Sequence, residues 1–318
     1  MKNPDTPRDH GGGIDAAAAR YGGARRDWMD LSTGINPVPY PVGDVSAGAW
    51  TTLPDAGAME RLVAAARAFW TVPEGAEIVV APGASALIAR VPGLAAPGKV
   101  YIPGPTYNEH AAAFVASGFS VGDNPAARIH VHVHPNNPDG CFSFDTMTIK
   151  PALTVLDESF CDVCPERSLV HETGDDRLIV LKSFGKFWGL AGLRLGFAIG
   201  GARQMGRLRD MLGPWPVSGA ALEIGARALS DQVWAMQTRE RLARDAARLD
   251  RIMTNAGAVV VGGTTLFRLY DVADAHIWQD RLARGHIWSR VFPYSGTWLR
   301  LGLPGTDADW ARLESVLA

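Results

Sequence analysis

The sequence predicts an α/β protein with a mostly parallel sheet sandwiched by helices, followed by a smaller α+β domain. In the first part of the chain, short apolar runs alternate with helical stretches, which is the pattern of parallel strands joined by helices. Most of these runs are followed by Gly, Pro, Ser or Asp at their C-terminal ends. In open α/β sheets, ligands bind at the C-terminal ends of the strands. Later in the chain, a long helical stretch precedes several short strands and helices.

Each expected element has a sequence signal of its own. A helix over Met59–Phe69 places apolar residues at helical spacing, and Ala220–Asn255 has continuous helical character, which predicts one linking helix. The strands expected in the first domain are Ile78–Ala81, Val100–Ile102, Ile129–Val133, Leu153–Leu156, Leu178–Leu181 and Leu195–Ile199. The second domain is expected to contain strands over 258–261, 266–269 and 298–301, a helix around 277–283 and a last helix from Asp307.

Composition limits the class of function. The 318 residues are 47% hydrophobic with a formal net charge of -2, so the chain can bury a full core and shows no positive excess for nucleic acid. No apolar run reaches the roughly 18 residues of a membrane span, and the N-terminus has no apolar signal-peptide region. With only three cysteines, these features predict a cytoplasmic protein that acts on small molecules, without nucleic-acid or membrane partners.

The densest chemical motif is Ser-Phe-Gly-Lys-Phe-Trp-Gly-Leu-Ala-Gly-Leu-Arg-Leu-Gly over residues 183–196, directly after a predicted strand. Lys186 supplies an amine that can form an imine, while Ser183 and Arg194 can bind a phosphate. The glycines allow the backbone to approach a ligand closely. This set suits a phosphorylated aldehyde; the alternative is a Gly-rich loop with a solvated lysine.

Three further strand-end segments add complementary groups. Asn137, flanked by prolines in the segment 134–140, has an amide that can donate to a phenolate oxygen. Asp157 ends an apolar strand, where a buried carboxylate needs a cationic partner such as a protonated pyridine nitrogen. The turn 81–85 leads into a helix, and the free N–H groups there favour an anion.

Together these segments resemble the fold-type I pyridoxal-phosphate (PLP) enzymes of the aminotransferase class I/II superfamily. The order Asn-Asn-Pro-x-Gly, Asp-Glu-x-Phe and Ser-x-x-Lys-x-x-Gly-Leu-x-Gly-x-Arg-x-Gly carries the resemblance, which extends over essentially the whole chain. It implies the PLP-dependent transferase fold, pyridoxal 5′-phosphate as cofactor and a homodimer. It also implies an N-terminal segment over 1–40 that joins the small domain, a large PLP-binding domain over 41–230 and a small C-terminal domain over 231–318.

The resemblance implies a role for each matched residue. Lys186 would be the Schiff-base amine and proton shuttle, Asp157 would bind the ring nitrogen, and Asn137 would bind O3′. Tyr107 would stack on the pyridine ring and complete this catalytic set. The phosphate would be held by Gly83, Ala84, Ser85, Ser183 and Arg194.

Two positions depart from the pattern of the family. Many relatives have a tyrosine at the position of Phe160, with its hydroxyl on O3′, and another at the position of Leu53, which crosses the dimer interface to the cofactor phosphate. One or two cofactor hydrogen bonds are therefore missing or replaced, each worth about 1 kcal/mol. Cofactor binding should survive this loss.

Two other patterns are compatible with metal or redox chemistry. His130, His132 and His134 lie at period two on one predicted strand, and Cys161 and Cys164 form a Cys-x-x-Cys pair. We expect core histidines and no metal site, because no carboxylate or cysteine partner is in an obvious position. The cysteines have no second pair and are not expected to form a metal or redox site.

Substrate binding is predicted from two arginines and the N-terminus. Arg300 matches the arginine that binds the substrate α-carboxylate in the family, and Arg290 is expected on a neighbouring strand. Two guanidiniums suit a substrate with two anionic groups, or a phosphate alone. The segments 10–13 and 30–37 resemble the entry segment of L-threonine-O-3-phosphate decarboxylases of cobalamin biosynthesis, which implies a lid that brings His10 to the substrate phosphate.

The resemblance therefore predicts decarboxylation of L-threonine O-3-phosphate to (R)-1-amino-2-propanol O-phosphate. An alternative is a histidinol-phosphate aminotransferase or another PLP aminotransferase, because the Lys186 motif is shared by these enzymes. A non-enzymatic alternative is a catalytically silent scaffold in corrin assembly, which the intact Lys186, Asp157 and Asn137 disfavour.

Overall fold

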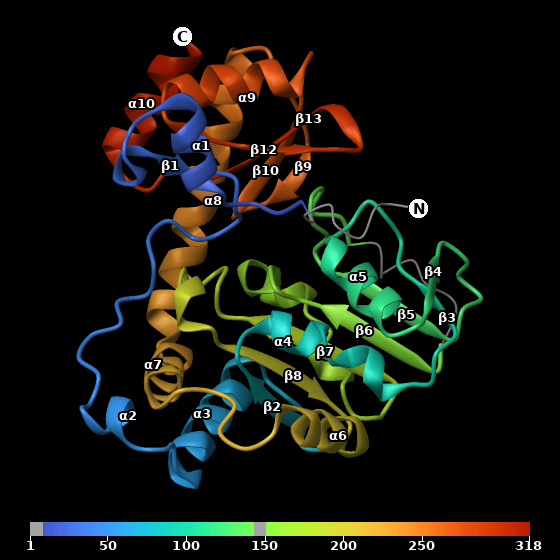
Figure 1. Cartoon of the computed structure of the whole chain (residues 1–318). Coiled ribbons are helices and arrows are strands. Elements are labelled where there is room, and N and C mark those ends of the chain that lie inside the picture. The colour runs from blue at the N-terminus through green and yellow to red at the C-terminus, as the bar shows by residue number, and fades with distance from the viewer. Residues whose placement is uncertain (1–8, 143–150) are drawn as a thin grey trace. The chain divides into compact units, whose positions relative to one another are not determined.

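A computed structural model describes residues 9–142 and 151–318 (Figure 1). Two compact units divide the chain: Pro39–Arg239, here called the large unit, and Met1–Val38 with Glu240–Ala318, here called the small unit. The predicted boundaries stood at 40/41 and 230/231, and the units divide at 38/39 and 239/240. Residues 1–8 of the predicted N-terminal segment lie outside the described residues.

The large unit is built on a seven-stranded sheet with the order β2-β8-β7-β6-β5-β3-β4. Neighbouring strands from β7 to β4 run parallel, whereas β8 is antiparallel to both β7 and β2. The mostly parallel sheet confirms the predicted fold class. The strand β4 was not predicted, because its three residues are not buried and give no apolar run. The strands are β2 (Glu77–Ala81), β3 (Lys99–Tyr101), β4 (Ser120–Gly122), β5 (Ile129–Val133), β6 (Leu153–Asp157), β7 (Leu178–Ser183) and β8 (Gly196–Gly200).

The two faces of this sheet bury different kinds of side chain. Leu153 and Val155 of β6 pack in an apolar cluster with residues from α4, α5 and α6. Because side chains alternate along a strand, Asp157 lies on this same face, whereas Lys182 of β7 lies on the opposite face from Leu181. The helices of the unit are α2 (Gly48–Thr51), α3 (Ala56–Phe69), α4 (Ala84–Ile88), α5 (Asn108–Ala116), α6 (Ala202–Leu212) and α7 (Gly219–Ser230), with short 3-10 helices over Val91–Leu94, Cys161–Val163, Pro165–Arg167, Val170–Glu172 and Ala191–Leu193.

The single helix predicted over Ala220–Asn255 is two helices, so this prediction is wrong. Asp231 separates α7 from α8 (Gln232–Asn255), with a backbone φ of -95° and ψ of 77° that is not helical. Its carboxylate accepts a hydrogen bond from the backbone N–H of Trp234 at 2.9 Å. This is the N-cap interaction that starts a new helix, so one aspartate ends α7 and begins α8.

The small unit has the α+β character that the sequence predicts. Its main sheet is antiparallel, in the order β12-β13-β10-β9, and a separate parallel pair joins β1 to β11. The N-terminal segment belongs to this unit, because Ile14 and Ala17 pack against Trp28 and Ala283. Its elements are α1 (Ile14–Tyr21), a 3-10 helix (Arg25–Asp27), β1 (Met29–Asp30), β9 (Val259–Thr264), β10 (Phe267–Asp271), α9 (Ala275–Arg284), β11 (Ile287–Trp288), β12 (Arg290–Phe292), β13 (Ser295–Gly302) and α10 (Asp307–Leu317).

Across the part of the chain that the structure describes, no helix combines the length and the apolar character that a membrane crossing requires.

Candidate functional site

One cavity in the large unit collects most of the residues predicted to bind the cofactor. It opens where β5, β6 and β7 end, which is the edge at which ligands bind in parallel sheets. The predicted residues that line it are Ala84, Ser85, Tyr107, Asn137, Asp157, Ser183, Lys186 and Arg194. Further lining comes from Ile88, Val133, Ser159, Phe160, Gly185 and Ala191.

Asp157 is a buried carboxylate with well-defined partners. His110 Nε2 lies 2.8 Å from its Oδ2, and its Oδ1 accepts hydrogen bonds from the backbone N–H of Ser159, at 3.0 Å, and from the Ser159 hydroxyl. Burial alone would raise the pKa of Asp157, but the contacts with His110 and Ser159 outweigh it and lower the pKa below its ordinary value. Asp157 is therefore ionised at neutral pH and can stabilise a protonated pyridine nitrogen.

Sequence reasoning missed His110. This histidine is only 1% exposed and comes from the first turn of α5, three residues after Tyr107. No signal in the sequence pointed to it, because Tyr107 is the extended N-cap residue of α5 and the spacing Tyr107-x-x-His110 does not place the two side chains on one helix face. The two rings lie edge to face, with centroids 6.1 Å apart.

Lys186 lies on a loop that large aromatic side chains anchor to the core. Phe184, Phe187 and Trp188 have no exposed surface, and the backbone N–H of Phe184 donates to the Leu195 carbonyl at 3.1 Å. The Lys186 Nζ lies 5.3 Å from the centroid of the Phe160 ring. The loop is therefore packed on both sides of the lysine, while the amine lines the cavity.

A glycine turn and an arginine form the anion-binding side of the cavity. Gly83 has a φ of +83°, and a Cβ at this position would lie 2.6 Å from the Arg194 guanidinium. A Cβ on Gly196 would lie 2.4 Å from the backbone nitrogen of Ala84. Only glycine fits at these two positions. The turn that starts α4 and the guanidinium are thus brought together, as a phosphate site requires.

This donor set fits PLP. The cavity offers the Lys186 amine for the aldehyde, the ionised Asp157 for the ring nitrogen and the Tyr107 ring for the pyridine face. Asn137 adds an amide, and the turn at Gly83 faces a guanidinium that suits the phosphate.

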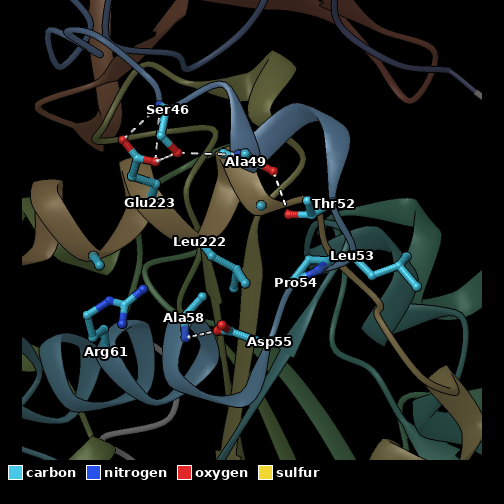
Figure 2. A pocket seen from close by; sticks show the side chains of 13 residues that line it. Ser46, Ala49, Thr52, Leu53, Pro54, Asp55, Ala58, Arg61, Leu222 and Glu223 are labelled. Atoms are coloured by element: carbon cyan, nitrogen blue, oxygen red, sulfur yellow. Dashed lines mark hydrogen bonds between the residues drawn. The ribbon is translucent and has the colours of Figure 1, made fainter.

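The two positions that depart from the family pattern lie in different places. Phe160 lines the cofactor cavity and is 4% exposed, whereas Leu53 is 66% exposed and lines a second cavity beside α2, α3 and α7 (Figure 2). There Asp55 caps α3 by accepting a hydrogen bond from the Ala58 N–H at 2.9 Å (Figure 2). No lysine or histidine is among the residues that line this second cavity, so it lacks the amine that PLP chemistry needs.

A buried ionic cluster lies on the face of β7 that points away from the cofactor cavity. Lys182 Nζ is 2.6 Å from Glu158 Oε2 and 3.5 Å from Asp162 Oδ1, and all three side chains are almost fully buried. Asp162 also accepts hydrogen bonds from the indole N–H groups of Trp70, at 2.9 Å, and Trp188, at 3.2 Å. Burial alone would lower the pKa of Lys182, but the two carboxylates outweigh it and raise the pKa.

The three strand histidines lie on that same far face and are buried. His134 Nε2 lies 2.9 Å from the Arg167 carbonyl, and His130 Nε2 lies 2.9 Å from the Ala127 carbonyl. Burial, then the neighbouring His130 and His134, lower the pKa of His132 to about 4. Within residues 9–142 and 151–318, no group of three or more His, Cys, Asp or Glu side chains could hold a metal ion.

Cys161 of the cysteine pair has the properties of an unreactive thiol. Cys161 is buried, and its Sγ lies 3.6 Å from the carbonyl oxygen of Cys164. The side-chain hydrogen bond with Cys164, together with burial, raises the pKa of the Cys161 thiol. A thiol that stays protonated is a poor nucleophile and a poor metal ligand.

The predicted substrate arginines come together in the small unit. Arg290 on β12 pairs directly with Arg300 on β13, which confirms the expected neighbouring strands and places both side chains on one face of the sheet. Arg300 is 5% exposed and donates to the Ser32 carbonyl at 2.7 Å. Burial, then the charge of Arg290, lowers the pKa of Arg300 to about 10, so it stays cationic at neutral pH.

The N-terminal segment is bound to the same unit. The Arg290 guanidinium donates to both carboxylate oxygens of Asp9, at 2.8 and 2.7 Å, and the neighbouring His10 is exposed. The Gly12 N–H donates to the Ser32 hydroxyl at 2.6 Å, and the Trp288 indole donates to the Gly12 carbonyl at 2.8 Å. Sequence reasoning did not single out Asp9.

Comparison with known proteins agrees with this arrangement. The family described as aminotransferase class I and II matches residues 123–316. A threonine-phosphate decarboxylase of Sinorhizobium sp is 39% identical, with 98% of each chain covered, and one of Pseudomonas aeruginosa is 37% identical, with 97% of each covered. The solved histidinol-phosphate aminotransferase from Sinorhizobium meliloti in complex with pyridoxal-5′-phosphate has a TM-score of 0.82 at 18% identity, covering 96% of this chain and 94% of that one. This chain therefore belongs to the aminotransferase class I and II family.

Proposed function

We propose that this protein is a PLP-dependent decarboxylase that converts L-threonine O-3-phosphate to (R)-1-amino-2-propanol O-phosphate in cobalamin biosynthesis. The observation that carries the proposal is the pair of guanidiniums, the buried Arg300 and the half-buried Arg290, on facing positions of two strands. A pair of this kind suits a substrate with two anionic groups. The near full-length similarity to two proteins named threonine-phosphate decarboxylase supports the same substrate class.

The large unit would hold the cofactor. Lys186 would bind the aldehyde, Asp157 the ring nitrogen, Asn137 the O3′ oxygen and Tyr107 the ring face. Bound PLP supplies an electron sink for the pair left on the substrate Cα when its carboxylate departs. The phosphate would be held by Gly83, Ala84, Ser85, Ser183 and Arg194, which fit an anion as described above.

The residues of the chain then have separate tasks. Arg300 binds the α-carboxylate, and Arg290, with His10, binds the side-chain phosphate. Two anchors fix the rotation about the Cα–N bond of the substrate, and this rotation determines which bond at Cα is broken. The Lys186 amine then moves a proton to Cα in place of the lost carboxylate.

Product analysis with O-phospho-L-threonine tests the proposal. The PLP-loaded protein should release carbon dioxide without any requirement for 2-oxoglutarate, and the amine product should retain its phosphate. Transfer of the amino group of histidinol phosphate to 2-oxoglutarate would instead make the protein a histidinol-phosphate aminotransferase. A protein that shows no PLP absorbance band after incubation with the cofactor would be a catalytically silent scaffold.

Matched arginine variants test the assignment of the two anchors. Arg290→Ala should remove most of the preference for threonine phosphate over threonine, because only the phosphorylated substrate uses this side chain. Arg300→Ala should lower kcat/KM for both substrates alike. If Arg290→Ala leaves the ratio of the two kcat/KM values unchanged, Arg290 does not bind the phosphate.

The resemblance to the family also supports a homodimer, and the low cysteine content supports a cytoplasmic location. Light scattering after size-exclusion chromatography would measure the assembly directly. A mass of one chain at micromolar concentration would contradict the proposed dimer.

A further inference from the structure

The anion-binding face of Arg290 is engaged by a carboxylate of the same chain. Asp9 accepts one hydrogen bond from each terminal nitrogen of the guanidinium, at 2.8 and 2.7 Å. The Arg290 side chain is 12% exposed and that of Asp9 is 41% exposed. This two-pronged geometry is the one in which arginine binds carboxylates and phosphates alike, so Asp9 occupies the position that an incoming anion would need.

We propose that Asp9 is an internal competitor for the anion site at Arg290, and that the phosphate of the substrate binds by displacing it. The inference rests on the proposed function, because it concerns the arginine assigned there to the substrate phosphate. It adds a residue that tunes substrate affinity through Arg290. It also makes substrate binding an exchange, in which the guanidinium gives up one anion for another.

The competitor is held close to its site. The Gly12 N–H bonds the Ser32 hydroxyl, and the Trp288 indole bonds the Gly12 carbonyl, so the chain three residues after Asp9 is fixed to the small unit. A tethered carboxylate has a high effective concentration at Arg290, even after it has been displaced. Every anion that needs this guanidinium therefore loses affinity by the same factor. A monoanion is attracted weakly to the Arg290 guanidinium and does not displace Asp9. A phosphate dianion is attracted more strongly and does displace it.

A second interpretation of the pair makes the opposite prediction. If Asp9 instead orients Arg290 for the substrate, its removal would loosen the guanidinium and weaken anion binding. The neighbouring Arg300 donates to the neutral Ser32 carbonyl and also feels the charge of Asp30, whereas Asp9 is the carboxylate that pairs directly with Arg290. Removal of Asp9 thus adds net positive charge at the paired arginines, and this favours the competitor interpretation.

Isothermal titration calorimetry with inorganic phosphate tests the proposal on the PLP-loaded, full-length protein, and the KM of O-phospho-L-threonine, which this protein would consume, serves as the binding measure for the second ligand. Asp9→Ala and Asp9→Asn should tighten the binding of both ligands by a common factor of about ten, the change expected for loss of one partly buried, charge-assisted competitor. Asp15→Ala is the matched control, because Asp15 pairs with Arg25 at 2.7 Å on the exposed surface of the same unit. This control should leave both affinities unchanged.

The double variant identifies the arginine through which Asp9 acts. In an Arg290→Ala background, Asp9→Ala should change neither affinity, because the contested site is gone. Weaker or unchanged phosphate binding by Asp9→Ala in the otherwise wild-type protein would overturn the proposal. Tighter phosphate binding without any carbon dioxide from O-phospho-L-threonine would uphold the competitor and refute only the proposed decarboxylase function.

Discussion

Replacing Lys182 with methionine should destabilise the large unit, because the change leaves two buried carboxylates without their cation. Lys182 Nζ lies 2.6 Å from Glu158 and 3.5 Å from Asp162, and the three side chains are at most 5% exposed. Methionine has a similar length and no charge, so the loss of packing should be small.

The structure sets the size of the expected effect. Breaking a buried ion pair by removing one partner costs about 3–5 kcal/mol. Glu158 keeps hydrogen bonds from the Leu169 N–H, at 2.7 Å, and the Ser168 hydroxyl, at 2.6 Å, and Asp162 keeps those from two tryptophans. Because these neutral donors remain, we expect the lower end, about 3 kcal/mol. For a unit of this size that corresponds to a fall in melting temperature of about 6–12 °C.

Thermal unfolding of the PLP-loaded protein, followed by circular dichroism, measures the change. Arg203→Met is the control, since Arg203 forms an exposed pair with Asp176 at 3.0 Å, and surface pairs contribute less than about 1 kcal/mol. Lys182→Met combined with Glu158→Gln and Asp162→Asn should recover much of the loss, because no buried charge is left. A Lys182→Met protein as stable as Arg203→Met, or a triple variant less stable than Lys182→Met alone, would refute the electrostatic argument.

Four further outcomes are expected. Lys186→Ala should abolish turnover and leave the circular dichroism spectrum unchanged, and activity within about tenfold of wild type would remove Lys186 from its role. Asp157→Asn should lower kcat by several orders of magnitude, because a neutral amide cannot keep the pyridine nitrogen protonated; near-normal rates would mean that another group does so. Gly83→Ala should weaken PLP binding at least about tenfold in fluorescence titrations, since its Cβ would lie 2.6 Å from the Arg194 guanidinium at a φ of +83°, and an unchanged Kd would show that the turn can shift. The pKa of His132 is lowered from 6.5 to about 4, so as the pH falls the unfolded chain takes up a proton at this residue before the folded protein does. The stability that the neutral His132 contributes is therefore complete above pH 6.5. Between pH 6.5 and about 4 the free energy of unfolding should fall by up to about 3 kcal/mol. Urea titrations over this pH range should show a shallower decline for His132→Gln than for wild type, and parallel curves would contradict the assignment.

The sheet and the cofactor cavity were predictable because their signals are local. Buried parallel strands appear as continuous apolar runs, and the residue after such a run stands at the ligand edge of the sheet. Asp157 and Lys186 could therefore be placed at one edge before any tertiary contact was known. The break at Asp231 was a missed local signal, since an aspartate that follows a serine inside a helical run is typical of an N-cap.

The partners of these residues were not predictable, because they depend on contacts between distant segments. His110 meets Asp157 from a helix 47 positions earlier, and Lys182 meets Glu158 across 24 positions. Asp9 and Arg290 are 281 positions apart. An isolated Asp or His in a sequence gives no indication of such pairing, because the same residue type serves equally well on the surface.

Because side chains alternate along β6, the consecutive residues Asp157 and Glu158 point to opposite faces of the sheet, and each face needs its own carboxylate. Asp157 belongs to the cofactor cavity, and Glu158 belongs to the Lys182 cluster on the other face. A deletion of one residue between Leu153 and Asp157 would move Glu158 to the position of Asp157 and Ser159 to that of Glu158, leaving the wrong acid at the cavity and Lys182 without its closest carboxylate. Protein engineers can therefore vary loop lengths around this site far more freely than the length of β6. When a distant relative is aligned to this chain, a gap inside that strand identifies either a misplaced alignment or a protein that has lost the site.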